Sequence, residues 1–180
     1  MTSEEKIRQA DLDTLRVVHY PDPRLREVST PIEQIDESVR ALTEKMFDLM
    51  VVASGVGLAA PQVGVTVRLF VGIPTEDPND RRVYINPEIV AVDGSDDGDE
   101  GCLSFPGITC RVKRFETATI RAQGLDGELF EETGTGLAAR IYQHESDHLD
   151  GRLLVDRMGT VAKLAARRTL KDLVEEYEGE

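Results

Sequence analysis

The sequence predicts a single domain of the α+β class, with antiparallel strand pairing. Apolar residues first recur at helical spacing, then alternate with polar residues as in strands, and finally return to helical spacing. This order of one helix, several strands and two helices favours antiparallel over parallel sheets. The chain has 180 residues and contains no internal repeat and no linker-like segment, so we expect residues 1–180 to form one domain.

The first predicted element is a helix over residues 36–53. Val39, Leu42 and Met46 recur there at helical spacing. Asp36 is a suitable N-cap, and Gly55 follows the predicted end of the helix. The chain starts with a mixture of acidic, basic and small polar residues, and we expect residues 1–14 to be a flexible extension.

The strand patterns lie in the middle of the chain. Apolar and β-branched residues mark four predicted strands, at residues 65–71, 83–85, 89–92 and 115–123. A turn at Leu125-Asp126-Gly127 allows the last strand to return through Leu129 and Phe130 as a hairpin. Two helices then close the chain, one over residues 136–150 and a C-terminal helix within residues 160–178.

Composition and charge exclude some classes of partner. The formal net charge of −13 disfavours DNA, which attracts proteins with a basic face. No apolar run is long enough to span a membrane, and the N-terminus resembles neither a secretory signal nor a transit peptide, so we expect a cytoplasmic protein. The acidic cluster of Asp93, Asp96, Asp97 and Asp99 is expected to lie in a solvated loop. Glu100, which ends the cluster, is considered below with the segment EGCLS.

A metal-binding pattern stands within the predicted helix over residues 136–150. His144 and His148 are four residues apart, so their side chains project about 40° from each other on a helix and can bind one ion. Glu145 can reach a metal-bound water without being a ligand. The same helix face carries apolar residues, so a buried histidine pair without metal is the alternative.

Two histidines are too few for a catalytic ion, which usually takes three protein ligands and keeps a position open for water. Leu154 stands where one group of metallopeptidases has a third histidine, which disfavours that group. The remaining candidates are His19, Cys102, Cys110 or a carboxylate. Cys102 is favoured because small residues surround it in the segment EGCLS, residues 100–104. Cys110 is expected to be a buried thiol, and His19 a loop or packing residue.

A third segment, GVGLAAPQ at residues 55–62, could be an ordinary connection between a helix and a strand. With EGCLS and QHESDHLDG (residues 143–151), however, it completes three motifs that stand in the same order in peptide deformylases. The segment YPDPRLR at residues 20–26 adds to the resemblance, which runs from about Leu15 to about Met158. The sequence therefore resembles the peptide deformylase family.

The resemblance implies a fold and a set of roles. It implies antiparallel sheets around a central helix that carries the HExxH motif, followed by a C-terminal helix. Cys102, His144 and His148 would bind the metal, and Glu145 would be the general acid/base. Gln62 and the Leu103 N–H would stabilise the oxyanion. The substrate would be bound by Val56, Gly57, Gly101, Leu137 and Ile141. Arg140 stands where many relatives have an apolar pocket residue, and we expect its stem to pack and its charge to reach solvent.

The implied activity is hydrolysis of the formyl group from the N-terminal methionine of new polypeptides, with methionine preferred and broad specificity beyond it. The resemblance implies Fe²⁺, one ion per chain, with Zn²⁺, Ni²⁺ or Co²⁺ able to substitute. The alternatives are an HExxH metallopeptidase and a structural metal protein with a fourth ligand. A basic group on the C-terminal helix, Lys163, Arg167, Arg168 and Lys171, is either a solvated face or a contact with the ribosome.

Overall fold

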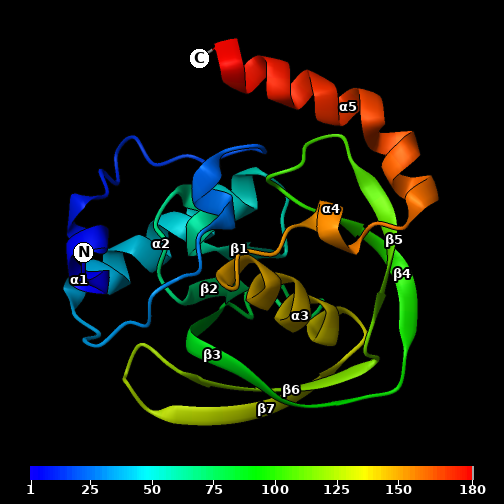
Figure 1. The fold of residues 1–180 in the computed structure, drawn as a ribbon. Coiled ribbons are helices and arrows are strands. Elements are labelled where there is room, and N and C mark those ends of the chain that lie inside the picture. The colour runs from blue at the N-terminus through cyan, green and yellow to red at the C-terminus, as the bar shows by residue number, and fades with distance from the viewer. Residues whose placement is uncertain (180) are drawn as a thin grey trace.

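A central helix, α3 (Leu137–Leu149), lies against strands on several sides, as Figure 1 shows for the computed structural model of the chain. The structure describes residues 1–179, and Glu180 lies outside the described residues. All strand pairs within the two sheets are antiparallel, so the predicted α+β class is confirmed. The prediction of a helix over residues 136–150 is also confirmed.

The larger sheet has five strands in the order β1-β2-β3-β6-β7. Its strands are β1 (Gly57–Ala59), β2 (Leu69–Gly72), β3 (Arg82–Asp93), β6 (Thr117–Gln123) and β7 (Leu129–Thr135). The smaller sheet is a hairpin of β4 (Asp96–Gly101) and β5 (Thr109–Arg114). Short helical segments connect these elements: η1 (Pro23–Arg26), η2 (Ala60–Val63) and α4 (Leu154–Arg157).

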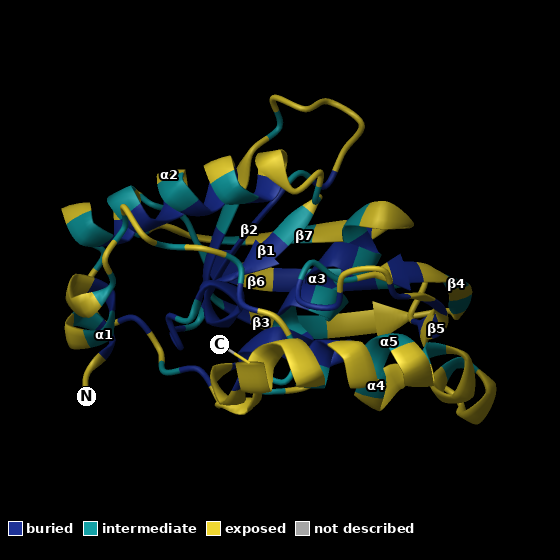
Figure 2. Ribbon diagram, turned by 90° about the horizontal axis from the view of Figure 1, so that it is seen from above, coloured by how far each residue is buried: buried dark blue, intermediate teal, exposed yellow. Residues whose placement is uncertain are grey.

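Helix α2 (Glu37–Val52) covers the larger sheet with its apolar face. The Asp36 side chain accepts a 2.9 Å hydrogen bond from the Ser38 N–H, which confirms the predicted N-cap. Met46 and Leu42 are fully buried against apolar residues of β2. Figure 2 shows this division of the helix into one buried and one exposed side.

The N-terminal residues differ from the expected flexible extension. Helix α1 (Ser3–Gln9) has a complete capping box, because Thr2 and Glu5 hydrogen-bond each other's backbone N–H groups. Ile7 is buried in the same core cluster as residues of α2, and the Lys6 ammonium donates to the Thr66 hydroxyl at 2.8 Å. A local cap, one buried apolar residue and the contacts of Lys6 and Arg8 with Thr66 and Asp36 therefore form and dock this helix, although the segment is polar overall.

The acidic segment before Cys102 is not a solvated loop. Residues 96–101 form β4, which pairs with β5 over its whole length. Asp96, Asp97 and Asp99 are exposed or half-exposed on this hairpin, but Glu100 is buried. The density of acidic residues predicted a loop, but basic residues on β5 and α3 pair with several of these carboxylates and allow the segment to form a strand.

Two strand predictions also need correction. Of the strand predicted over residues 65–71, the part before Leu69 lies outside β2. Val65, Thr66 and Val67 are buried, and they form only an isolated bridge between Val67 and Thr30. The two short strands predicted on either side of Pro87 are one strand, β3, with a register shift between Ile85 and Glu88. A proline lacks the N–H that a regular ladder requires, so the irregularity falls there. The hairpin of β6 and β7 is confirmed.

The last helix, α5 (Thr160–Gly179), runs along the outside of the molecule (Figure 1). Leu173 is its one buried residue among those described, and it packs on the cluster that includes Phe105. Figure 2 accordingly shows α5 as mostly exposed. No helix within residues 1–179 is both long enough and apolar enough to cross a membrane.

Candidate active site

Helix α3 brings both histidines of the predicted metal motif to one place. It begins after Gly136, whose φ of 55° is a conformation that glycine adopts readily. The rings of His144 and His148, one turn apart, have their centroids 5.0 Å from each other. Burial, followed by positive neighbours, lowers the pKa of His148 well below its ordinary value, so its ring is neutral and suited to ligation.

Cys102 completes a cluster with the two histidines. It directly follows β4, and its Sγ lies 3.2 Å from His148 Nε2. The possible ligand atoms of Cys102, His144 and His148 all lie within 4.8 Å of one another. A thiolate with two imidazoles is a donor set typical of zinc and iron sites. Within residues 1–179 this is the one cluster of its kind, so the residues fit a metal ion.

The other two candidates for the third ligand lie elsewhere. Cys110 is buried on β5 in an apolar cluster, and burial raises the pKa of its thiol. His19 is exposed in a loop at the edge of the cavity described below. Both placements agree with the sequence-based predictions.

Glu145 is held in a narrow space beside this cluster. It is 4% exposed, and its Oε2 atom has no hydrogen-bond partner among the described residues. Burial raises the pKa of Glu145 to about 7, so its carboxyl group can both take up and release a proton near neutral pH. A Cβ atom at Gly57 would lie 2.4 Å from Glu145 Oε1, so the absence of a side chain at Gly57 makes room for this carboxylate.

Gln62 is fixed by its own backbone turn. Its Oε1 accepts a 2.9 Å hydrogen bond from the Ala59 N–H at the start of η2. Its Nε2 therefore points away from that turn and donates to Ser104 Oγ at 3.2 Å and toward Cys102 Sγ at 3.5 Å. The side-chain amide is thereby presented as a donor beside Cys102 Sγ.

These groups open into a cavity of about 720 Å³ between α3, β1 and the β4–β5 hairpin. Of the eleven predicted site residues, ten line it: Val56, Gly57, Gln62, Gly101, Cys102, Leu103, Leu137, Ile141, His144 and Glu145. His148 lies behind the wall, 1% exposed and in contact with Cys102. The structure thus brings together residues that are up to 92 positions apart in the sequence.

Comparison with known proteins agrees with this geometry. The sequence pattern of the family described as "Polypeptide deformylase" matches residues 14–164. A peptide deformylase of Acidobacterium capsulatum is 46% identical over 158 residues, which are 86% of this chain and 93% of that protein. The chain belongs to the polypeptide deformylase family.

Solved deformylase structures have the same fold. That of the Legionella pneumophila peptide deformylase has a TM-score of 0.84 at 42% identity, over 93% of this chain and 99% of the other. That of the Plasmodium falciparum peptide deformylase has a TM-score of 0.87 at 36% identity, over 91% and 98% of the two chains. Deformylases are metal-dependent enzymes that remove the formyl group from nascent polypeptides.

The deformylase site also contains charged residues that sequence reasoning left out. Glu100 lies close to His144, with 3.0 Å between Oε2 and the ring Nδ1. Arg114 donates to both oxygens of Glu100 and also to Asp147. Burial opposes ionisation of Glu100, but the hydrogen bonds from His144 and Arg114 outweigh it and lower the pKa of Glu100 far below its ordinary value.

One expectation about this part of the site is wrong. The Arg140 charge does not reach solvent, because its side chain is 13% exposed and its guanidinium contacts Asp96 and Glu100. Asp147 could have been predicted from the sequence to lie near the site, because it follows His144 by three residues and residues three apart share a helix face. Arg114 and Arg140 gave no such signal, because their shared partner Glu100 lies on β4, a strand that was predicted to be a loop.

Proposed function

We propose that this chain binds a ferrous ion through Cys102, His144 and His148 and uses Glu145 as the general acid/base of deformylation. Its substrate is the N-terminal formyl-methionine of new polypeptides. The observation that carries the proposal is the position of Glu145: a buried carboxyl group, with one oxygen unpaired, beside the Cys/His/His cluster and inside the cavity.

A bound metal ion would lower the pKa of a water ligand and polarise the formyl carbonyl group. Glu145 accepts the proton of the attacking water and later delivers it to the leaving amine. Its pKa of about 7 suits both transfers, because neither the acid nor the base form is strongly favoured at neutral pH.

Gln62 and Leu103 stabilise the charge that forms on the formyl oxygen. The Gln62 amide is already oriented by the Ala59 N–H, so it does not have to reorganise during the reaction. The Leu103 N–H follows Cys102 directly in the chain and would be the second donor. Both residues line the cavity.

The methionine side chain occupies the apolar part of the cavity. Leu137 and Ile141 project from α3 one turn apart and line the wall next to His144. Val56, Gly57 and Gly101 border the cavity on strands β1 and β4 or beside them, where the peptide backbone of a substrate can be hydrogen-bonded. Positions beyond the methionine lie toward the cavity mouth, which agrees with broad specificity there.

The finer assignments are part of the same proposal. A thiolate with two imidazoles suits Fe²⁺, and also Zn²⁺, Ni²⁺ or Co²⁺. The protein is expected to be cytoplasmic, where nascent chains emerge. The basic group of Lys163, Arg167, Arg168 and Lys171 is exposed on α5 and suits phosphates of ribosomal RNA. A solvated helix face is the alternative, since Lys171 already pairs with Glu175 at 3.0 Å.

Metal analysis of protein purified without oxygen tests the assignment. We expect about one iron per chain in the wild type, loss of the metal in Cys102→Ala, and wild-type metal content in Cys110→Ala. Cys110 is the matched control because it is the second thiol of the chain and lies in an apolar cluster. Loss of metal in Cys110→Ala with retention in Cys102→Ala would overturn the proposed ligand set.

A further inference from the structure

Six charged side chains form a continuous chain of ion pairs beside the cavity, and their signs alternate. Two of them, Arg140 and Glu100, also line the cavity wall. The order is Asp96, Arg140, Glu100, Arg114, Asp147 and Arg157. The two ends are partly exposed, with 44% of the Asp96 side chain and 37% of the Arg157 side chain accessible. The middle pair, Glu100 and Arg114, is 4% exposed at each side chain. The three carboxylates balance the three guanidinium groups, so the buried part carries little net charge.

Glu100 is the point at which this chain meets the proposed metal site. Its Oε2 lies 3.0 Å from His144 Nδ1 and accepts from Arg114 Nη2 at 2.9 Å. Its Oε1 accepts from Arg114 Nε and from Arg140 Nη1, both at 2.8 Å. The carboxylate is thus held on both oxygens, and the Nδ1 contact leaves His144 Nε2 as the ligand atom.

Arg140 has a prepared place in this arrangement. Its Nη1 also donates to the Val112 carbonyl oxygen at 3.1 Å, and its Nη2 donates to Asp96. A Cβ atom at Gly98 would lie 2.9 Å from Arg140 Nη2, so the glycine on β4 leaves space for the guanidinium group. Arg140 therefore connects α3 to both strands of the hairpin that carries Glu100.

We propose that Arg140, held by Asp96, is a positioning residue for the metal site, because it fixes Glu100 and Glu100 in turn fixes the His144 ring. The inference rests on the proposed ligand set of Cys102, His144 and His148. Without Arg140, Glu100 Oε1 would lose one of two donors while still buried, and the chain of ion pairs would gain an uncompensated negative charge. A buried carboxylate in that state moves toward other donors, and the His144 orientation loosens with it.

Mutation of a group that orients a histidine ligand typically lowers metal affinity by about 10- to 100-fold. We therefore expect Arg140→Ala to weaken metal binding by about this factor. Asp96→Asn should weaken it in the same direction but less, because only the exposed end of the chain changes. The double variant should bind about as weakly as Arg140→Ala alone, because Asp96 acts on Glu100 only through Arg140.

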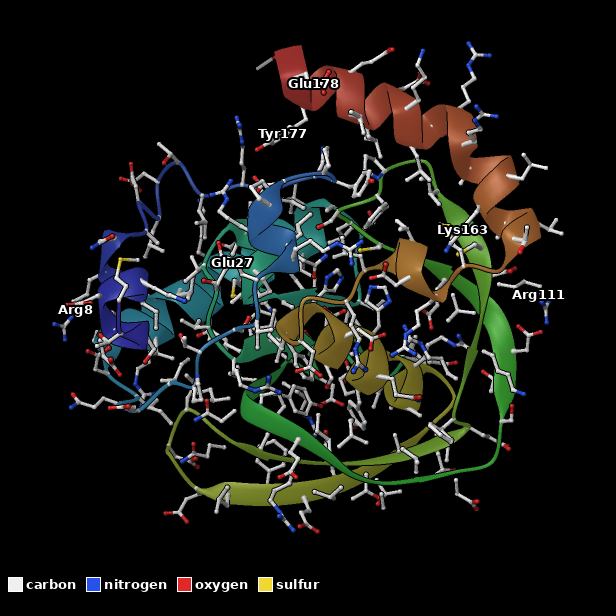
Figure 3. All side chains as sticks on the ribbon, in the orientation of Figure 1. Arg8, Glu27, Arg111, Lys163, Tyr177 and Glu178 are labelled. Carbon is white, nitrogen blue, oxygen red and sulfur yellow. The ribbon has the colours of Figure 1, made fainter. Side chains whose placement is uncertain are left out.

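Arg111→Ala is the matched control. Arg111 lies on the same hairpin and pairs with Asp97 at 3.5 Å, but its side chain is 65% exposed. Figure 3 shows that it points outward from β5, away from α3. This variant removes one arginine and one ion pair of the hairpin without touching Glu100.

The experiment titrates metal-free full-length protein with Co²⁺, whose visible absorption reports both affinity and ligand geometry. We expect weaker binding and an altered spectrum for Arg140→Ala, and wild-type values for Arg111→Ala. Wild-type affinity and spectrum in Arg140→Ala would overturn the inference. If Arg140→Ala does not fold, Asp96→Asn provides the test instead, and wild-type Co²⁺ binding in that variant would overturn the inference.

Cys102→Ala separates this inference from the proposed function. If Cys102→Ala binds Co²⁺ as the wild type does, the ligand set is wrong and both proposals fall. If Cys102→Ala loses binding while Arg140→Ala and Asp96→Asn do not change it, the inference about Arg140 alone is wrong.

Discussion

Helices α2 and α3 both pack against the larger sheet, but they bury different kinds of side chain. The buried residues of α2 are apolar except for Thr43, whose hydroxyl donates to the Arg40 carbonyl oxygen at 2.7 Å. Helix α3 buries Glu145, Asp147 and His148 together with apolar residues. Both helices therefore bury an apolar face, but α3 also buries a reactive face beside Cys102 and the β4–β5 hairpin.

This difference has an energetic consequence. Burial of an apolar side chain stabilises the fold by about 1.5–3 kcal/mol, whereas a buried charged group costs free energy unless it is fully paired. Asp147 is paired with two arginines, but Glu145 Oε2 has no partner among the described residues. We infer that α2 supplies stability and that α3 gives up some stability to hold the site.

The largest expected effect is that of Glu145→Gln on turnover. The amide cannot carry the proton from water to the leaving amine, and loss of a general acid/base typically lowers the rate by about 100- to 10,000-fold. Metal content should not change, because Glu145 is not a ligand. The free energy of unfolding should stay the same or rise, since an unpaired buried carboxylate is removed. Turnover and metal content should be measured on one sample, and near-normal turnover would exclude Glu145 as the acid/base.

The converse effect is expected for Met46→Ala on α2. Met46 is fully buried, and truncation of such a side chain typically lowers the free energy of unfolding by about 2–5 kcal/mol. The folded fraction should keep its metal and its turnover per metal ion. Chemical denaturation measures the free energy of unfolding, and an activity assay on protein of known metal content measures turnover per metal ion. A large loss of turnover per metal ion would contradict the division between the two helices.

A smaller effect is expected at the start of α2. Asp36→Ala removes the N-cap, which typically costs about 1 kcal/mol. Hydrogen bonds, first from Ser38, lower the pKa of Asp36 to about 2, so its contribution is present above the ordinary value of 3.8 and is lost as the pH falls toward 2. Denaturation curves of variant and wild type should therefore differ at pH 7 and approach each other in acid. A difference that is independent of pH would exclude the charged cap as its source.

The sequence was a good guide to the reactive face of α3. Helical spacing alone brings His144, Glu145 and His148 together, since the motif lies within one element. Cys102 and Gln62 come from other elements, and their place depended on motifs that resemble a known family. The helix over residues 36–53 was equally predictable from the sequence, because the helical spacing of its apolar residues and the Asp36 N-cap indicate the same helix.

The charged residues around the site could not be predicted from the sequence in this way. The acidic segment that leads to Glu100 was predicted to be a solvated loop, and the Arg140 charge was predicted to reach solvent. Their burial depends on the pairing of β4 with β5 and on the contact of this hairpin with α3, which are long-range features. Helix α1 was missed for a related reason: its docking rests on Ile7, a capping box and the contacts of Lys6 and Arg8 within a polar segment.

A single assay tests most directly whether the reactive face of α3 performs deformylation. Iron- or nickel-loaded protein is incubated with formyl-Met-Ala-Ser and with acetyl-Met-Ala-Ser, and formate, acetate and peptide fragments are resolved. An acetyl methyl must fit where the formyl hydrogen lies, and overpacking of a tight site costs roughly 1–3 kcal/mol, or about one to two decades in rate. We therefore predict rapid release of formate, much slower release of acetate and no fragments. Fragments without formate would contradict the account and indicate a metallopeptidase.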